Sequence, residues 1–226
     1  MCFSAGVSFG ASAVILVISV ASFKKASTPA QTVLAGIPLF FGIQQAIEGV
    51  LWLSLQHEEY HYLYSLATHS FLVLALVVWP TMIPLMAMLP EQDERRRKIL
   101  KLLLCTGVLV SLFHLYCLIH FGASASAKPN HIRYEFHFPE SMKYLSSIIY
   151  FIPALIPAFI SGIKALRWLG LALVCSYAFS WIFYHHYIIS VWCFFATIIS
   201  GIALIAIVQM QTKEKARLAV LPRRRD

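Results

Sequence analysis

The chain has 226 residues, of which 59% are apolar and only 12% are charged, and its formal net charge is +8. A soluble domain carries about a quarter of its residues as charges, so this composition excludes an ordinary soluble globular protein. The basic residues stand between and after long apolar runs. That placement argues against nucleic acid as a partner and is typical of the topology signals of a membrane protein.

Seven apolar segments follow one another along the chain. Each is long enough to cross a hydrocarbon layer ~30 Å thick, which takes about 20 helical residues. The segments cover residues 4–23, 32–55, 61–89, 98–121, 142–163, 166–185 and 187–210. We therefore predict an all-α bundle of seven transmembrane helices. Residues 1–210 would form its single domain, and residues 211–226 would form a basic tail.

The basic residues predict the direction of the helices. If the helices alternate, fifteen of the eighteen basic residues lie on one side of the membrane. The fifteen are Lys24, Lys25, Arg95, Arg96, Arg97, Lys98, Lys101, Lys164, Arg167, Lys213, Lys215, Arg217, Arg223, Arg224 and Arg225. The positive-inside rule then places the N-terminus outside and the C-terminus in the cytoplasm. The basic tail is expected to touch anionic membrane lipid.

The first segment contains small residues at every fourth position, namely Gly6 and Gly10, and Ser4, Ser8 and Ser12. This spacing allows two helix backbones to approach closely. It predicts either tight packing of this helix inside the bundle or a seam between two copies of the chain, which would make a homo-oligomer.

The second segment contains Glu48, the one acidic residue inside a predicted span. Gln44, Gln45 and Trp52 share its helical face by the i+3 and i+4 spacing. A carboxylate in hydrocarbon costs several kcal/mol, so it should face the bundle interior or stay protonated. Glu48 is thus a candidate catalytic acid or base. The alternative is a neutral side chain that forms a hydrogen bond to a neighbouring helix.

The third and fifth segments each contain two prolines four residues apart, Pro80 and Pro84 in one and Pro153 and Pro157 in the other. Proline removes a helical hydrogen bond. The third segment is also the longest, so we predict a kink or a tilt in it.

Histidines collect on the predicted outer half. They are His57, His61, His69, His114, His120, His131, His137, His185 and His186. His114 and Cys117, at i and i+3, could face one metal ion, zinc or copper, with His69 or Glu48 as a further ligand. The alternative for each is a hydrogen-bonded or buried packing residue.

The longest outer loop, residues 122–141, begins with small residues and then alternates strictly. Ile132, Tyr134, Phe136 and Phe138 point one way, and His131, Arg133, Glu135 and His137 the other. Period two predicts a short strand with one buried face, which follows a flexible first half. A loop of this length with its own pattern is typical of a lid, and the alternative is a flap on the bilayer interface.

Two cysteines complete the predicted outer cavity. Cys2 lies at the outer end of the first segment, and Cys193 lies in the outer third of the last, beside Trp192. They could form a disulfide in an oxidising exterior. They could instead be thiols of a metal or catalytic site, or simply small buried residues.

Several stretches resemble an uncharacterised family of bacterial membrane proteins. The resembling pieces are MCFSAGVSF at 1–9, QQAIEGVLWL at 44–53, VVWP at 77–80, HIRY at 131–134 and SVWCFFA at 190–196. The resemblance implies one polytopic domain in a bacterial cytoplasmic membrane, and it implies no reaction. It marks as signature positions Cys2, Gln45, Glu48, His131, Tyr134, Trp192 and Cys193. His69, His114, His185 and His186 fall outside these motifs.

These features predict an outward-facing polar pocket that binds a metal or a small amphiphilic ligand. One interpretation is a membrane-embedded enzyme in which Glu48 does acid–base work and residues 122–141 form the lid. A second is a sensor whose outer histidines respond to mild acid. A third is a transporter or channel, although the inner halves of the segments are almost without polar residues, whereas a pathway needs them in both halves.

Overall fold

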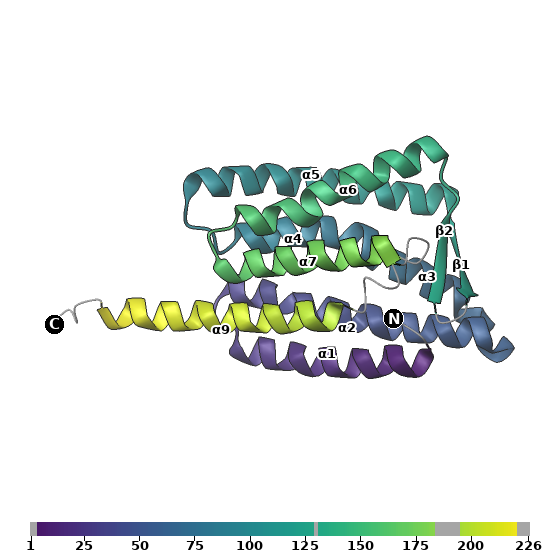
Figure 1. Ribbon diagram of the computed structural model, residues 1–226, viewed down its shortest axis with the longest axis horizontal. Coiled ribbons are helices and arrows are strands. Elements are labelled where there is room, and N and C mark those ends of the chain that lie inside the picture. The colour runs from purple at the N-terminus through teal and green to yellow at the C-terminus, as the bar shows by residue number, and fades with distance from the viewer. Residues whose placement is uncertain (1–3, 129–130, 184–194, 221–226) are drawn as a thin grey trace.

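The computed structural model describes residues 4–128, 131–183 and 195–220, which form a bundle of long helices with a two-stranded hairpin at one end (Figure 1). The helices are α1 (Ala5–Lys25), α2 (Pro29–Gln56), α3 (Tyr64–Val73), α4 (Trp79–Met88), α5 (Glu94–Phe121), α6 (Glu140–Ile160), α7 (Lys164–Phe183) and α9 (Ala196–Val220). A short 3-10 helix, η1 (Glu58–Leu63), precedes α3, and a π-helical turn, η2 (Leu74–Val78), joins α3 to α4.

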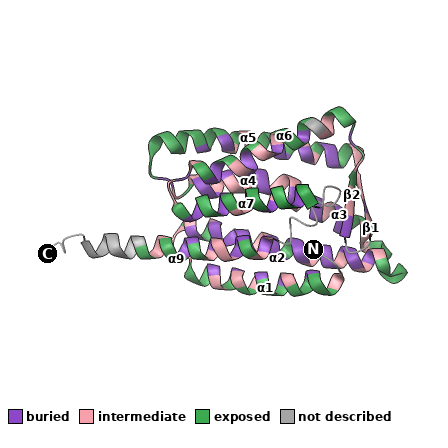
Figure 2. Cartoon of the chain, viewed as in Figure 1, coloured by how far each residue is buried: buried purple, intermediate pink, exposed green. Residues whose placement is uncertain are grey.

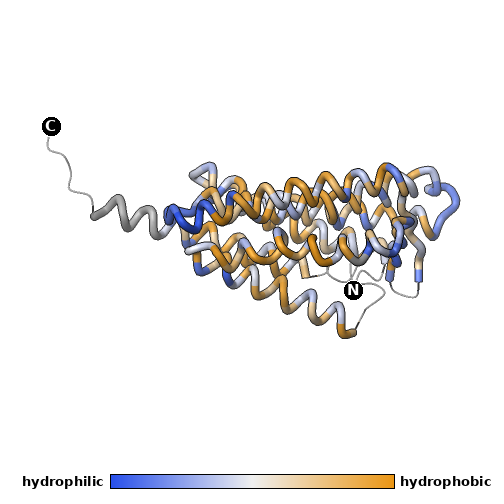
Figure 3. The backbone as a smooth tube through the Cα atoms, turned by 90° about the horizontal axis from the view of Figure 1, so that it is seen from above, coloured by the Kyte–Doolittle hydropathy of each residue, from blue (hydrophilic) through white to orange (hydrophobic). Residues whose placement is uncertain are grey.

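Within the described residues, six helical stretches are long and apolar enough to cross a membrane. They are α1, α2, the continuous run Glu58–Met88, α5, α6 and α7. The predicted seventh segment, 187–210, begins outside the described residues, and the apolar part of α9 that is described, Ala196–Thr212, is shorter than a full span. The chain is therefore a helical protein with the composition of a multi-pass membrane protein. Figure 3 shows the same pattern, with hydrophobic residues along the bundle and hydrophilic ones concentrated at its ends.

Helix ends follow capping chemistry that the sequence carries. Thr28 caps α2 by accepting a hydrogen bond from the backbone N–H of Gln31 (3.3 Å), and the Gln31 side chain accepts one from the N–H of Ser27 (2.8 Å). Asp93 caps α5 through the N–H of Arg96 (2.9 Å). Gly122, with φ of +73°, ends α5, because a residue without a Cβ adopts that conformation without strain.

The third span, for which the sequence predicted a kink or a tilt, contains a π-helical turn just before Pro80. Pro80 has no N–H, so carbonyls one turn before it lose their helical donor. The π-helical turn η2 lies there, and hydroxyl groups from neighbouring helices bond to its carbonyls. Tyr150 of α6 donates to the carbonyl of Ala75 (2.7 Å), and Ser111 of α5 donates to that of Val77 (2.5 Å). These bonds matter because a membrane interior offers no water to satisfy a free carbonyl.

One end of the bundle is basic. The C-terminal end of α1, the N-terminal ends of α5 and α7 and the C-terminal end of α9 all lie at this end, opposite the hairpin (Figure 1). The described side chains there include Lys24, Lys25, Arg95, Arg96, Arg97, Lys98, Lys101, Lys164 and Arg167. We refer to this as the basic end and to the opposite one as the hairpin end.

Helix α1 packs on α2 through serines rather than through its Gly-x-x-x-Gly pair. Ser8, Ser12, Ser19 and Ser22 are buried, and the Ser12 hydroxyl donates to the carbonyl of Gly42 (2.8 Å). Gly6 and Gly10 are exposed, on the face of α1 turned away from the bundle. The small-residue pair therefore leaves an open helix face, and the predicted seam between two copies remains a prediction.

The main core joins the helices near the basic end and the middle of the bundle, and buried residues also reach the hairpin end (Figure 2). It includes Ile15 of α1, Leu34 of α2, Trp79 of α4, Leu100 of α5, Leu169 of α7 and Ile199 of α9. A smaller cluster holds Leu51 and Trp52 of α2 against Ala67 of α3 and against Ala125 and Ile132 of the hairpin. The hairpin is thereby fixed to the ends of α2 and α3.

The outer loop forms the antiparallel hairpin β1 (Ala123–Lys128) and β2 (His131–Phe136), paired from Ala123 with Phe136 to Lys128 with His131. The predicted strand is present, and Ile132 and Phe138 are buried while Glu135 and His137 are exposed. The expectation of a flexible first half was wrong, because residues 123–128 form the partner strand. The small residues of this segment show no alternation of apolar and polar side chains, so the sequence did not predict a strand there. The segment is a strand because it pairs with β2.

Candidate functional site

Four side chains on one face of α2 build a polar cluster inside the bundle near its hairpin end. Gln44, Gln45, Glu48 and Trp52 are all buried, and Glu48 has 0% exposure. Gln45 Nε2 donates to Glu48 Oε2 (3.3 Å), and the Trp79 indole donates to Gln44 Oε1 (3.1 Å). A carboxyl group is thus enclosed at membrane depth with amide groups beside it. We call these four residues the α2 polar face.

Buried polar atoms without a protein partner occur around this face. Among the described residues, no hydrogen-bond partner lies within reach of Ser8 Oγ of α1, Trp52 Nε1 of α2 or Thr68 Oγ1 of α3. The bond from Ser12 to the Gly42 carbonyl sets the register of α1 on α2, so Ser8 lies one turn closer to the hairpin end, level with the α2 polar face. Thr68 follows Ala67, which packs in the same cluster as Trp52. Such unmatched donors are rare in proteins and point to a water or a ligand.

The hairpin covers the end of this region. Tyr134 packs against two apolar clusters at once and stacks on Phe71 of α3, with ring centroids 4.8 Å apart and planes 3° apart. Tyr64 of α3 anchors the opposite strand, because its hydroxyl accepts from the N–H of Ala125 (2.8 Å) and donates to the carbonyl of the same residue (3.0 Å). The hairpin is therefore a packed cover. His131 lies at its buried edge.

We predict that His131 makes the packing of the hairpin depend on pH. Burial lowers the pKa of the His131 imidazole below its ordinary value of 6.5. Below about pH 6.5 an opened hairpin takes up a proton that the packed one resists, so the stability of the packed hairpin is complete above that pH and is lost as the pH falls further. We expect faster amide exchange in residues 131–136 at pH 5.5 than at pH 7.5, after correction for intrinsic rates.

His131→Gln should remove this dependence, whereas His137→Gln, on the exposed face of the same hairpin, should keep it. Equal protection of β2 at the two pH values in the unmodified chain would contradict the role of His131.

The three predicted metal ligands each have other contacts and are not grouped around one point. His114 Nδ1 lies 2.8 Å from the carbonyl oxygen of Val110, and its Nε2 lies 2.7 Å from Ser146 Oγ. His69 Nδ1 bonds to the carbonyl of Ser65 (2.8 Å), and Cys117 is buried in an apolar cluster. Within residues 4–128, 131–183 and 195–220, no three His, Cys, Asp or Glu side chains are grouped to hold a metal ion. The zinc or copper site of His69, His114 and Cys117 finds no support there.

Three predicted positions, Cys2, Trp192 and Cys193, lie outside the described residues, as do His185 and His186. The predicted disulfide between Cys2 and Cys193 therefore stays a prediction. Among the described positions, the structure places Gln45, Glu48 and Trp52 together on α2, and His131 and Tyr134 on the hairpin that packs against the end of that helix.

Two described residues that sequence reasoning missed belong to the same region, Tyr64 and Thr68. Tyr64 stands in a run of polar and aromatic residues typical of a membrane interface, which gives no sign that its hydroxyl holds a strand. Thr68 is a single hydroxyl in an apolar helix. Both are recognisable only once α3, α2 and the hairpin are seen in contact.

Comparison with known proteins assigns the chain to a family without assigning an activity. No curated protein and no solved structure matches the chain. A family profile described as a family of unknown function, DUF6629, matches residues 1–219. This match covers α1 to α7, the hairpin and nearly all of α9. The chain therefore belongs to DUF6629, a family of unknown function.

Proposed function

We propose that this chain is a seven-crossing protein of a bacterial cytoplasmic membrane that binds a small amphiphile at the α2 polar face, from the outer side. The observation that carries the proposal is Glu48, a carboxyl group with 0% exposure inside an apolar span. An ionisable side chain at membrane depth is costly to bury, and such residues mark substrate and ligand sites. The hydroxyl groups of Ser8 and Thr68 have no partner among the described residues and could accept hydrogen bonds from a ligand.

The chemistry of the site suggests the ligand class. The carboxylate oxygens of Glu48 and the amide oxygens of Gln44 and Gln45 can each accept more than one hydrogen bond, and the surrounding helices are apolar. The site therefore suits a head group that donates hydrogen bonds or carries a positive charge, attached to an apolar tail. The packed hairpin would cover the head group and exclude water. Acid–base catalysis by Glu48 on such an amphiphile is a further step of this proposal.

The ligand class is tested with single-chain amphiphiles in nanodiscs. Dodecylamine should raise the melting temperature of the full chain more than dodecanol does, and dodecyl sulfate should give no such gain, because only a ligand that binds the folded state stabilises it. Glu48→Gln keeps the volume and removes the charge, so it should weaken dodecylamine binding about tenfold, or about 1.4 kcal/mol. Each shift is measured against the variant's own baseline.

Glu140→Gln is the matched control, because Glu140 is exposed at the hairpin end and pairs with Lys143 (2.7 Å). It should leave the dodecylamine shift unchanged. An unchanged dodecylamine shift of the melting temperature in Glu48→Gln, or an equal loss of that shift in both variants, would show that Glu48 does not bind the ligand.

The orientation is tested separately by cysteine labelling in intact cells. A membrane-impermeant maleimide should react with Ser126→Cys in the hairpin, and with Lys98→Cys at the basic end only after the cells are opened. The basis is the positive-inside rule together with the gathering of basic residues at one end of the bundle. Labelling of Lys98→Cys alone in intact cells would reverse the orientation.

Among the other functions considered, the pH-responsive sensor has a specific observation in its favour. His131 is a buried histidine in the segment that covers the site, so protonation would loosen the cover. The exchange experiment on β2 described above tests this second function.

A further inference from the structure

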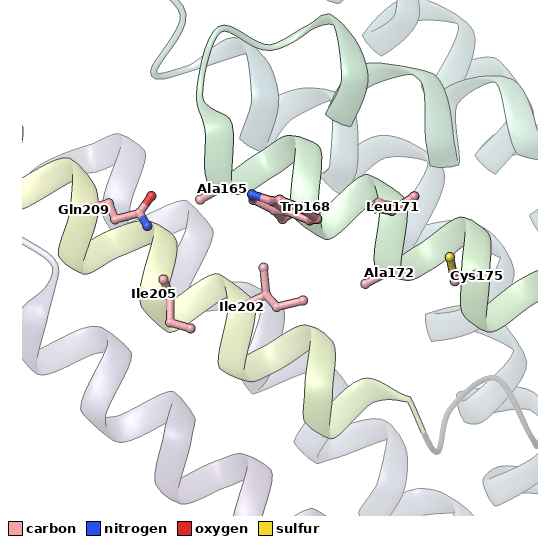
Figure 4. Close-up of a pocket in the computed structure, with 8 residues that line it drawn as sticks. All are labelled: Ala165, Trp168, Leu171, Ala172, Cys175, Ile202, Ile205 and Gln209. Atoms are coloured by element: carbon pink, nitrogen blue, oxygen red, sulfur yellow. The ribbon is translucent and has the colours of Figure 1, made fainter.

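An apolar groove of about 430 Å³ opens between α7 and α9, on the side of the bundle (Figure 4). Its walls include Ala165, Trp168 and Ala172 of α7 and Ile202, Ile205 and Gln209 of α9. The volume falls within the range of about 300–1,000 Å³ that ligand-binding pockets occupy. Helices α7 and α9 are in contact, so the groove is a hollow between two packed helices.

The groove is apolar along most of its length and has a polar side chain at one end. Its middle is lined by side chains such as Leu171 and Ile202, and Gln209 lies toward the end that holds Ala165 (Figure 4). Trp168 is 63% exposed, and its indole nitrogen points toward Ala165 (Figure 4). Tryptophan with its apolar ring in hydrocarbon and its N–H toward the surface is typical of the membrane interface.

Positive charge surrounds that polar end. Lys164 precedes Trp168 by four residues and Leu171 by seven, so it continues the same helical face of α7 by one turn, and it is exposed. Arg167 lies in the same turn, and a terminal nitrogen of Arg96 of α5 lies beside Gly162, where a Cβ would be 2.7 Å from it. Three basic side chains from two helices thus gather where the groove meets the basic end.

An acidic side chain close by, Glu91, offsets only one of these three positive charges. Glu91 is buried, and it accepts hydrogen bonds from the N–H groups of Gln92 and Asp93 (3.1 Å each) and of Gly162 (2.7 Å). A ligand in the groove would therefore meet an apolar channel that ends in a region of net positive charge.

We propose that this groove binds one anionic phospholipid from the leaflet at the basic end, with an acyl chain between α7 and α9 and the phosphate near Lys164. The charge complementarity selects an anionic lipid over a neutral one, and the apolar length of the groove selects a lipid over free phosphate. The inference relies on the chain lying in a membrane. The groove reaches the basic end, whereas Glu48 lies toward the hairpin end. Failure of the lipid experiment would therefore leave the proposed function at Glu48 intact, and the reverse also holds.

The test measures lipid retained by the full chain in mild detergent, using native mass spectrometry. Dioleoyl phosphatidylglycerol should be retained about fivefold more than dioleoyl phosphatidylcholine, and Lys164→Gln should remove most of this preference, the effect expected for one basic residue at a membrane surface. Lys98→Gln is the matched control, because Lys98 is an exposed lysine of α5 at the same end. An equal loss of the lipid preference in Lys98→Gln would show that the anionic lipid is attracted by the basic end as a whole, and this would overturn the proposed site.

A second pair of variants tests the apolar part. Ala172→Phe fills the groove and should lower retention of both lipids, whereas Ala178→Phe, at an exposed position of α7 outside the groove, should not. Two other outcomes would also overturn the proposal. One is full competition by glycerol phosphate, which has no acyl chain. The other is oxidative cross-linking between Cys175 residues of two copies together with loss of lipid, which would place a second chain in the groove.

Discussion

Replacing Gly107 by alanine should unfold most of the protein or prevent its insertion. Gly107 of α5 lies against α4, and a Cβ added there would be 2.0 Å from the carbonyl oxygen of Pro80 and 3.3 Å from Pro153 Cβ of α6. The first contact is with backbone, so no side chain can rotate away to relieve it. Overpacking of this kind costs about 3 kcal/mol or more, which is a large part of the stability of a domain.

The position of the Pro80 carbonyl explains why the contact is so close. A helix would pair this carbonyl with the N–H four residues later, but that residue is Pro84 and has no N–H. The crossing of α4, α5 and α6 therefore occurs at two prolines and one glycine. Pro80 and Pro153 both lie beside Gly107, and of these two proline-bearing spans the third contains a π-helical turn, whereas α6 does not.

Gly201→Ala is the control for this prediction. Gly201 lies in α9, and an added Cβ would meet nothing within 4 Å. Because alanine favours a helix over glycine by about 1 kcal/mol, Gly201→Ala should match or exceed the unmodified chain. Tryptophan-monitored melting in detergent measures both variants. Equal melting temperatures for Gly107→Ala and the unmodified chain would mean that α4 and α5 are not packed as described.

Removal of the Glu91 carboxylate should cost about 3 kcal/mol, since hydrogen bonds to charged groups contribute ~1.5–3 kcal/mol each and part of the loss is recovered by water. Glu91 lies in the α4–α5 connection, and its two oxygens accept three backbone N–H groups. One of the donors, Gly162, belongs to the α6–α7 turn. A single side chain thus links two connections at the basic end.

Glu91→Ala is compared with Glu94→Ala by the same melting experiment and by limited proteolysis of intact protein in detergent. Glu94 is exposed in the first turn of α5, so its removal should cost only a few tenths of a kcal/mol through the helix dipole. Cleavage near residue 162 should increase in Glu91→Ala alone. Similar behaviour of the two variants would show that the link between the connections contributes little.

Much of the fold follows from the order of apolar and polar residues. The predicted boundaries of the first six spans lie within a few residues of the described helices, because about 20 apolar residues in succession have few alternatives to a membrane-crossing helix. The alternation from His131 to Phe138 likewise predicted β2 with Ile132 buried and Glu135 exposed, but it placed His131 on the opposite face to Ile132, whereas the structure buries both. The candidate site was located in part by the same reasoning, because Glu48 is the one acidic residue within a predicted span.

Other features depend on pairings between distant residues that local pattern does not encode. The sequence alone did not separate the buried serines of α1 from its exposed glycines, because both recur at the same spacing. It showed no reason for β1 to be a strand, for Tyr64 to hold it, or for Glu91 to be buried. Each of these depends on a partner between 30 and 71 residues away or on the docking of a whole hairpin.

The sequence by itself determined the class of this protein, the extent of its first six apolar helices, the direction of its charge asymmetry and the presence of one carboxyl group within an apolar helix of span length. These features depend on composition and on the spacing of apolar residues within a short segment. Each segment therefore prefers water or hydrocarbon independently of the rest of the chain. Only the tertiary structure decided which polar atoms meet, which glycines carry a helix crossing and where a groove remains open. Those depend on the register between helices, and register is set by the sum of many side-chain contacts.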